Sequence, residues 1–185
     1  MRLVPRWLLA PSAQLAYVFL MYRWRDVWNE KAPVHRGVHL WLEGVNSDLY
    51  RERLIAALDL IDARAPVYLR WLRTRLPAIV VNQMLMVTRN VTWMDRRRGI
   101  LMIHPYTVWK ISPSNLAVYV VGAVTRARLG KRFERKRVLI RAGQRVLEEA
   151  VAFARMLPDG DAVVPAWERR LADFIKQYSQ AERSK

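Results

Sequence analysis

The chain has 185 residues, among them no cysteine, seven glycines and three histidines, and it carries half as many acidic as basic residues. Without cysteine it forms no disulfide framework, thiolate zinc site, cysteine nucleophile or iron–sulfur cluster. Glycine is too scarce for a glycine-rich phosphate-binding loop to be expected, and neither a dinucleotide-binding fingerprint nor a G-x-S-x-G nucleophile elbow occurs. These absences exclude several common classes of enzyme.

Positive charge and apolar side chains are what the chain has in excess. Lys and Arg number 32 against 16 Asp and Glu, so the formal net charge is +16, while 52% of the residues are hydrophobic and eight are Trp. This apolar content supports a folded core rather than a disordered basic tail, and the length fits one domain. The charge attracts nucleic acid phosphates or an anionic membrane surface, and composition alone favours neither.

Residues 7–22 form a run of 16 uncharged residues with arginines on both sides. The run is shorter than the roughly 20 apolar residues of a membrane-spanning helix, and it lacks a small-residue cleavage site, which disfavours a secretory signal peptide. We predict an aromatic and basic helix over residues 1–31 that either covers the core or lies on a membrane surface, with a true span disfavoured. The predicted location is the cytoplasm, at the inner face of the membrane. The predicted membrane-interface residues are Trp7, Tyr17, Phe19, Tyr22, Trp24 and Trp28.

Residues 32–185 are predicted to form an α+β domain that is mostly helical, with a small antiparallel sheet of about three strands. Alternating and β-branched apolar residues predict strands over residues 78–81, 86–94 and 100–104. Apolar residues at helical spacing predict helices over residues 48–64, 67–75, 113–129, 133–156 and 162–178. Ser47 or Asp48 is the expected N-cap of the first helix, and Ser112 and Gly130 bound the third.

The three histidines offer little catalytic chemistry. His35, His39 and Glu43 are spaced by four residues, as helical metal ligands are, but Gly37 and the alternating apolar residues after it favour extended chain and ordinary surface histidines. His104 is the last residue of a predicted strand, where a partly exposed structural residue is favoured over a general base. We predict no metal, no cofactor and no small-molecule substrate, and we predict that the chain is not an enzyme.

Residues 116–129 read LAVYVVGAVTRARL. They resemble the active-site helix of small bacterial zinc-metallopeptidase-like proteins, where the stretch reads approximately L-A-x-x-L-V-H-E-x-T-H-A-R-L. The resemblance extends over roughly residues 40–175, including the later FARMLPDG sequence at residues 153–160. The residues that match the motif are Leu116, Ala117, Val121, Thr125, Ala127, Arg128 and Leu129.

The metal-binding positions of the motif are all replaced in this chain. Where the family has two zinc-binding histidines and a catalytic glutamate, the chain has Gly122, Arg126 and Ala123, and the third ligand position falls near Gly143. Glycine and alanine carry no donor atom, and an arginine places a fixed cation where a dication is needed. The resemblance therefore implies a pseudoenzyme without a metal site.

A basic stretch over residues 126–145 is the remaining concentrated signal, with nine cations and one acid. It is interpreted either as a solvated helix face or as a docking surface for an anionic partner. We expect a non-catalytic, membrane-associated interaction or structural subunit that binds an anionic membrane surface or an acidic or membrane protein. The alternative is a nucleic-acid-binding basic domain, although no recognisable DNA- or RNA-binding motif is present. The predicted anionic-partner surface consists of Arg126, Arg128, Lys131, Arg132, Arg135, Lys136, Arg137, Arg141 and Arg145.

Overall fold

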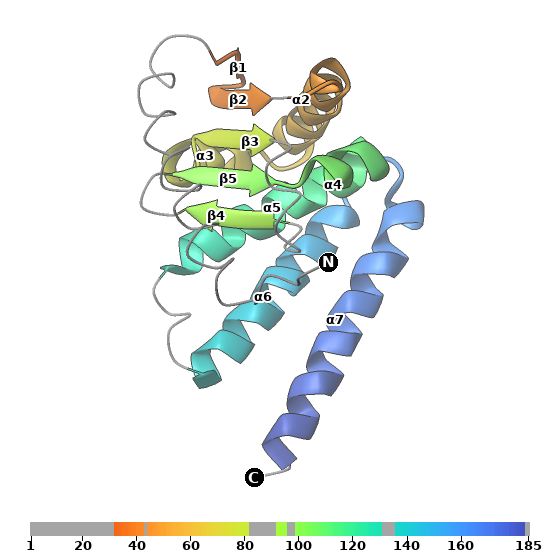
Figure 1. Cartoon of the computed structure of the whole chain (residues 1–185). Helices are drawn as coiled ribbons and strands as arrows, with labels where there is room; N and C mark the ends of the chain where they lie inside the picture. The colour runs from red at the N-terminus through yellow and green to blue at the C-terminus, as the bar shows by residue number, and fades with distance from the viewer. Residues whose placement is uncertain (1–31, 43, 82–91, 96–98, 131–135, 184–185) are drawn as a thin grey trace, which may run out of the picture. The chain divides into compact units, whose positions relative to one another are not determined.

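The computed structural model describes residues 32–42, 44–81, 92–95, 99–130 and 136–183 (Figure 1). The chain divides into two units, residues 1–33 and residues 34–185. The predicted helix over residues 1–31, with its six membrane-interface aromatic residues, lies outside the described residues.

A five-stranded mixed sheet has the strand order β1-β2-β3-β5-β4. The central strands β2, β3 and β5 are parallel, and β1 and β4 pair antiparallel with the strands beside them (Figure 1). The sequence-based expectation of a mostly helical α+β chain with a small sheet is confirmed, but the expectation of about three antiparallel strands was wrong. The strands are β1 (Val34–His35), β2 (Val38–Leu42), β3 (Ala78–Val81), β4 (Thr92–Asp95) and β5 (Ile100–Ile103).

The parallel pairing of β2 and β3 follows from the connection between them. It contains two helices, α2 (Ser47–Arg64) and α3 (Pro66–Arg75), and a crossover of this length returns the chain to the edge where β2 began. The β1–β2 connection is instead a two-residue turn in which Arg36 and Gly37 have φ angles of 51° and 74°. Positive φ at both residues is the type I′ geometry that suits a tight antiparallel hairpin.

Four more helices follow the sheet strands, namely α4 (Pro105–Lys110), α5 (Pro113–Leu129), α6 (Lys136–Ala154) and α7 (Gly160–Arg183). The predicted ends of α5 are confirmed, because Ser112 Oγ accepts a hydrogen bond from the Asn115 N–H and Gly130 follows with φ 61°. The predicted cap of α2 was wrong, because Asn46 is its N-cap. The sequence analysis missed α4, although His104 before Pro105 is a helix-start signal; the imidazole accepts from the Tyr106 N–H.

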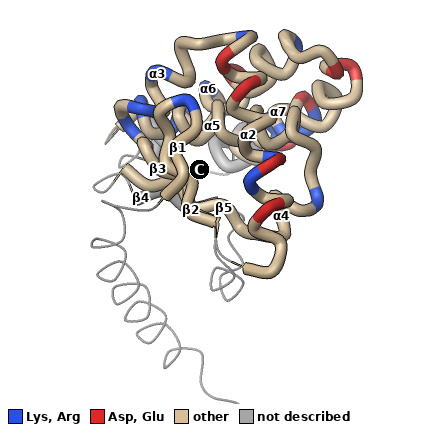
Figure 2. Tube along the Cα trace, turned by 90° about the horizontal axis from the view of Figure 1, so that it is seen from above, with Lys and Arg blue, Asp and Glu red and all other residues tan. Residues whose placement is uncertain are grey.

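The helices pack on the sheet in two layers. Side chains of β2, β3 and β5 form one hydrophobic core with α2, α3 and α5, and α6 and α7 pack on the outer side of these helices (Figures 1 and 2). Helix α5 is buried along most of its length, which explains its many β-branched residues. Within the described part of the chain, no helix has both the length and the apolar character needed to cross a membrane.

Candidate functional site

The small residues at the positions that resemble a zinc motif are packing positions in this fold. Gly122 and Ala123 are buried in α5, and Arg126 is exposed on the same helix. A Cβ atom placed on Gly122 would lie 3.6 Å from Val146 Cγ1 of α6, which is ordinary contact distance. No group of three or more His, Cys, Asp or Glu side chains in the described ranges is arranged to hold a metal ion.

The position expected for the third metal ligand is covered by an aromatic ring from α7. A Cβ atom on Gly143 would lie 2.5 Å from Phe174 Cζ, closer than side-chain atoms approach one another. Gly143 therefore allows α6 and α7 to pack closely at this turn. Gly122 faces α6 and Gly143 faces α7, so the two glycines do not line one common cavity.

We expect the two glycines to respond oppositely to alanine. Gly122→Ala is expected to raise the free energy of unfolding by about 0.5–1 kcal/mol, because alanine favours a helix and finds room there. Gly143→Ala is expected to lower it by about 1 kcal/mol, because the Phe174 ring must withdraw from α6. Urea denaturation of the two variants measures both changes. Equal stabilisation by both substitutions would contradict the close packing of Phe174 on Gly143.

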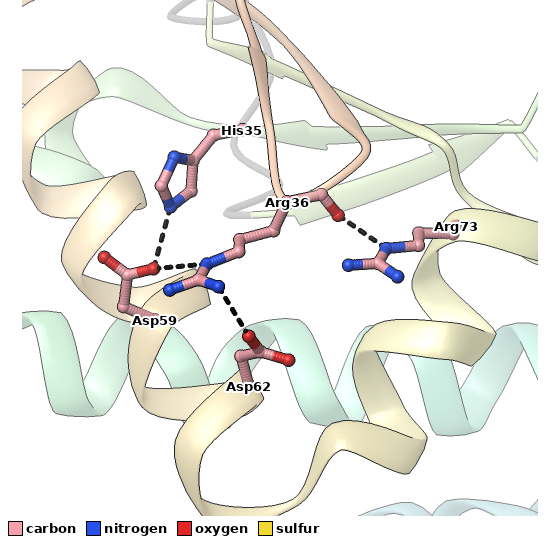
Figure 3. A network of polar contacts seen from close by, with 5 residues as sticks. All are labelled: His35, Arg36, Asp59, Asp62 and Arg73. Atoms are coloured by element: carbon pink, nitrogen blue, oxygen red, sulfur yellow. Dashed lines mark hydrogen bonds and ion pairs between the residues drawn. The ribbon is translucent and has the colours of Figure 1, made fainter.

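His35 and its hairpin are anchored to α2 by polar contacts. The extended conformation expected at His35 and His39 is confirmed, since they lie in β1 and β2. His35 Nε2 lies 2.8 Å from Asp59 Oδ1 of α2, and the Arg36 guanidinium reaches Asp59 and Asp62 at 2.9 and 3.0 Å (Figure 3).

The same anchor fixes the protonation state of Asp59. Burial raises the pKa of its carboxyl, but hydrogen bonds from His35 and Arg36 and their charges outweigh that effect, so the pKa lies below its ordinary value. Arg73 of α3 donates from Nε to the Arg36 carbonyl (Figure 3). The network therefore holds the turn at Arg36 and Gly37 against α2 and α3. Arg36 and Arg73 thus have a structural role.

Four of the nine predicted basic-surface residues have described side chains. Arg126 and Arg128 lie in the last turn of α5, and Arg141 and Arg145 lie on α6, which packs against α5. All four arginines are exposed. Lys136 and Arg137 belong to α6, but their side chains lie outside the described part, as do Lys131, Arg132 and Arg135.

Glu149 is the point at which α3, α5 and α6 meet through polar contacts. Its Oε1 atom lies 2.9 Å from Arg145 NH2 and 3.9 Å from Arg128 NH2, and its Oε2 atom accepts a hydrogen bond from the Tyr68 hydroxyl. Arg128 also stacks on Trp71 of α3, with its guanidinium carbon 4.0 Å from the ring centroid. One carboxylate thus holds two cationic side chains and a phenol in fixed positions.

The surroundings of Glu149 favour its ionised form. Burial raises the pKa of the Glu149 carboxyl, but the hydrogen bonds from Tyr68 and Arg145, together with the charges of Arg145 and Arg128, bring the pKa below its ordinary value. Burial and the hydrogen bond to Glu149 raise the pKa of the Tyr68 hydroxyl. At neutral pH the site therefore holds a carboxylate, a neutral phenol and two guanidinium groups.

The arginines of α3 are the part of the basic surface that the sequence analysis missed. Arg70 and Arg75 are exposed, and neither forms an ion pair with a described residue. Charge distribution is the signal that identifies them: residues 64–145 contain 18 Lys and Arg and two acids, a net charge of +16 that equals the charge of the whole chain. Figure 2 shows Lys and Arg positions gathered near α3 and β1.

Exposed aromatic rings lie away from the arginines of α3. Tyr106 and Trp109 of α4 are 49% and 51% exposed, and α4 follows the end of β5. The Arg75 carbonyl lies beside Gly99, which precedes the start of β5. Arg75 therefore lies near the start of β5, and α4 follows its end. In Figure 1 the arrow of β5 points toward α4.

Comparisons with models of protein families, with curated proteins and with solved structures found no match to this chain.

Proposed function

We propose that this chain is a non-catalytic subunit that docks on an anionic membrane surface through its basic surface. We define the basic surface by five of the exposed arginines of α3, α5 and α6, namely Arg70, Arg75, Arg128, Arg141 and Arg145. The metallopeptidase-like resemblance remains part of this proposal, with the small residues Gly122, Ala123 and Gly143 and the exposed Arg126 at the positions where the zinc motif has its donors. The proposed role is therefore binding, not hydrolysis.

Segregation of charge is the observation that supports the proposal. All of the excess positive charge belongs to residues 64–145, and the remaining residues carry equal numbers of basic and acidic side chains. A solvated surface that serves only solubility needs no such separation, because interspersed charges of both signs suffice. Each Lys or Arg near an anionic bilayer contributes about 1 kcal/mol of attraction.

The aromatic residues among these arginines favour lipid over nucleic acid. Single-stranded nucleic acids bind to basic grooves whose exposed aromatic rings stack with bases. Here Tyr68 is buried, and one face of Trp71 is covered by the Arg128 guanidinium. Neither ring is among the exposed aromatic side chains of the described residues, whereas attraction to a bilayer needs only exposed positive charge.

Binding to lipid vesicles tests this proposal. The full chain is expected to sediment with vesicles that contain phosphatidylglycerol and to remain in solution with phosphatidylcholine alone. The double variant Arg70→Gln/Arg75→Gln is expected to bind the anionic vesicles about 30-fold more weakly, since two contacts of about 1 kcal/mol each are lost. Added salt is expected to weaken binding of the unchanged chain as well.

A matched control removes the same charge from another helix. Arg169 and Lys176 are exposed on α7 and form no ion pair with a described residue. Arg169→Gln/Lys176→Gln is expected to change binding by less than about threefold, because these residues lie outside the basic surface. Equal losses in the two double variants would refute a localised docking surface. Retention of nucleic acid but not of vesicles would replace the proposal with the nucleic-acid alternative.

A further inference from the structure

Two guanidinium groups converge on one carboxylate at the junction of α3, α5 and α6. Arg145 contacts Glu149 Oε1 through Nε at 3.1 Å and through NH2 at 2.9 Å, while Arg128 NH2 lies 3.9 Å from the same oxygen. The side chains of Arg128 and Arg145 are nevertheless 34% and 58% exposed, and that of Glu149 only 17%. The carboxylate thus lies beneath two cationic groups that remain open to solvent.

The position of Arg128 is fixed from the core outward. The ring of Phe153, which is fully buried, contacts Tyr68 edge to face at a centroid distance of 5.9 Å, and Tyr68 contacts Trp71 in the same way at 5.2 Å. Arg128 stacks on Trp71 at the outer end of this series. A guanidinium held by both a ring and a carboxylate loses little conformational entropy when it binds a ligand.

The bound carboxylate does not use all the donors of these arginines. A guanidinium has five N–H groups, and the contacts of Arg145 with Glu149 involve only Nε and NH2. Arg141 lies one helical turn before Arg145 on α6 and is exposed, and no described residue forms an ion pair with it. These three arginines therefore stand beside two carboxylates of α6, those of Glu149 and of the exposed Glu148, which accepts a hydrogen bond from Gln144.

We propose that Arg128, Arg141 and Arg145 bind the phosphate monoester headgroup of an anionic lipid such as phosphatidic acid. This inference rests on the proposed membrane docking and names the lipid chemistry that the docking surface prefers. A phosphate monoester carries between one and two negative charges near neutral pH and presents three terminal oxygens in different directions. Planar guanidinium groups bind such oxygens in bidentate pairs. A phosphodiester lipid offers one charge and fewer free oxygens.

Charge-conserving substitutions separate this specific site from general attraction. Vesicles containing either phosphatidic acid or phosphatidylglycerol are matched in surface potential, and the full chain is expected to bind the first at least fivefold more tightly. Arg128→Lys/Arg145→Lys keeps the net charge but removes the forked donors. This variant is expected to lose the preference for phosphatidic acid, so that it binds the two kinds of vesicle equally. Arg169→Lys on α7 is the control and is expected to keep the preference.

Each outcome distinguishes this inference from the proposal on which it rests. Equal binding of the two vesicles by the unchanged chain, or a preference that survives Arg128→Lys/Arg145→Lys, overturns the inference and leaves membrane docking intact. Binding of neither vesicle overturns both. Soluble glycerol 3-phosphate is added in a separate NMR experiment. If it changes the chemical shifts of the arginine Nε–H groups while the chain shows no preference between the vesicles, the site binds a free phosphate ester and the proposal of a lipid ligand is overturned. Urea denaturation of the lysine variant checks that the fold is retained.

Discussion

Rebuilding the zinc motif in this chain, by Gly122→His/Ala123→Glu/Arg126→His, is expected to destabilise the fold without creating a metal site. Gly122 and Ala123 are buried where α5 packs against α6, and Ala123 is 8% exposed. A glutamate at position 123 loses hydration, and a histidine at position 122 is forced against Val146. The free energy of unfolding is expected to fall by about 3–5 kcal/mol, measured by urea denaturation.

Zinc is not expected to restore the stability of this triple variant. A third ligand would have to come from position 143, and the Phe174 ring already occupies the space beside Gly143. A ligand that binds only the folded state raises the thermal midpoint, so an unchanged midpoint with and without zinc is the expected result. Arg126→His alone alters an exposed residue and serves as the control, with an expected effect below about 1 kcal/mol. A zinc-dependent rise in the midpoint of the triple variant would contradict this expectation, because it would show that the rebuilt motif binds zinc in the folded state.

The sequence predicted most helices of this fold because their signals are local. Ser112 and Gly130 mark the ends of α5, and Pro66 begins α3, so each boundary depends on a residue beside it. Spacing of apolar residues then shows which side of each helix is buried. Each of these signals is contained within a few neighbouring residues, and the structure agrees with them at α3 and α5.

Sheet topology and the polar network required information that local patterns do not hold. Parallel pairing of β2, β3 and β5 depends on how the helical connections return, and a buried run such as Ala78–Val81 has the same appearance in either direction. The role of Glu149 does not follow from local sequence, because its partner Tyr68 is 81 residues away. The proposed basic surface combines residues of the stretch 126–145, which is continuous in the sequence, with arginines of α3 that lie outside that stretch.

Replacing Glu149 by glutamine is expected to lower the free energy of unfolding by about 1–2 kcal/mol at pH 7. A hydrogen bond to a charged group contributes about 1.5–3 kcal/mol, and this is reduced because Arg145 is 58% exposed. The pKa of Glu149 is lowered from its ordinary value of 4.5 in the folded chain. Its stabilising effect is therefore present above pH 4.5 and lost as the pH falls through the lowered pKa.

Unfolding measured against pH checks this expectation. The difference in stability between the unchanged chain and Glu149→Gln is expected to be constant near neutral pH and to disappear in acid. The control is Glu168→Gln, which removes an exposed pair with Arg155 and is expected to cost less than about 0.5 kcal/mol. A difference that is independent of pH would contradict an ionised Glu149 in the folded state.

The same substitution distinguishes a positioned pair of arginines from simple attraction. Glu149→Gln removes a negative charge, so general attraction to an anionic vesicle is expected to rise slightly. Arg128 and Arg145 lose the carboxylate that holds them 3.9 and 2.9 Å from one oxygen, and the preference for phosphatidic acid over phosphatidylglycerol is therefore expected to fall. Stronger binding to both lipids with an unchanged preference would mean that Glu149 does not position these arginines for a phosphate.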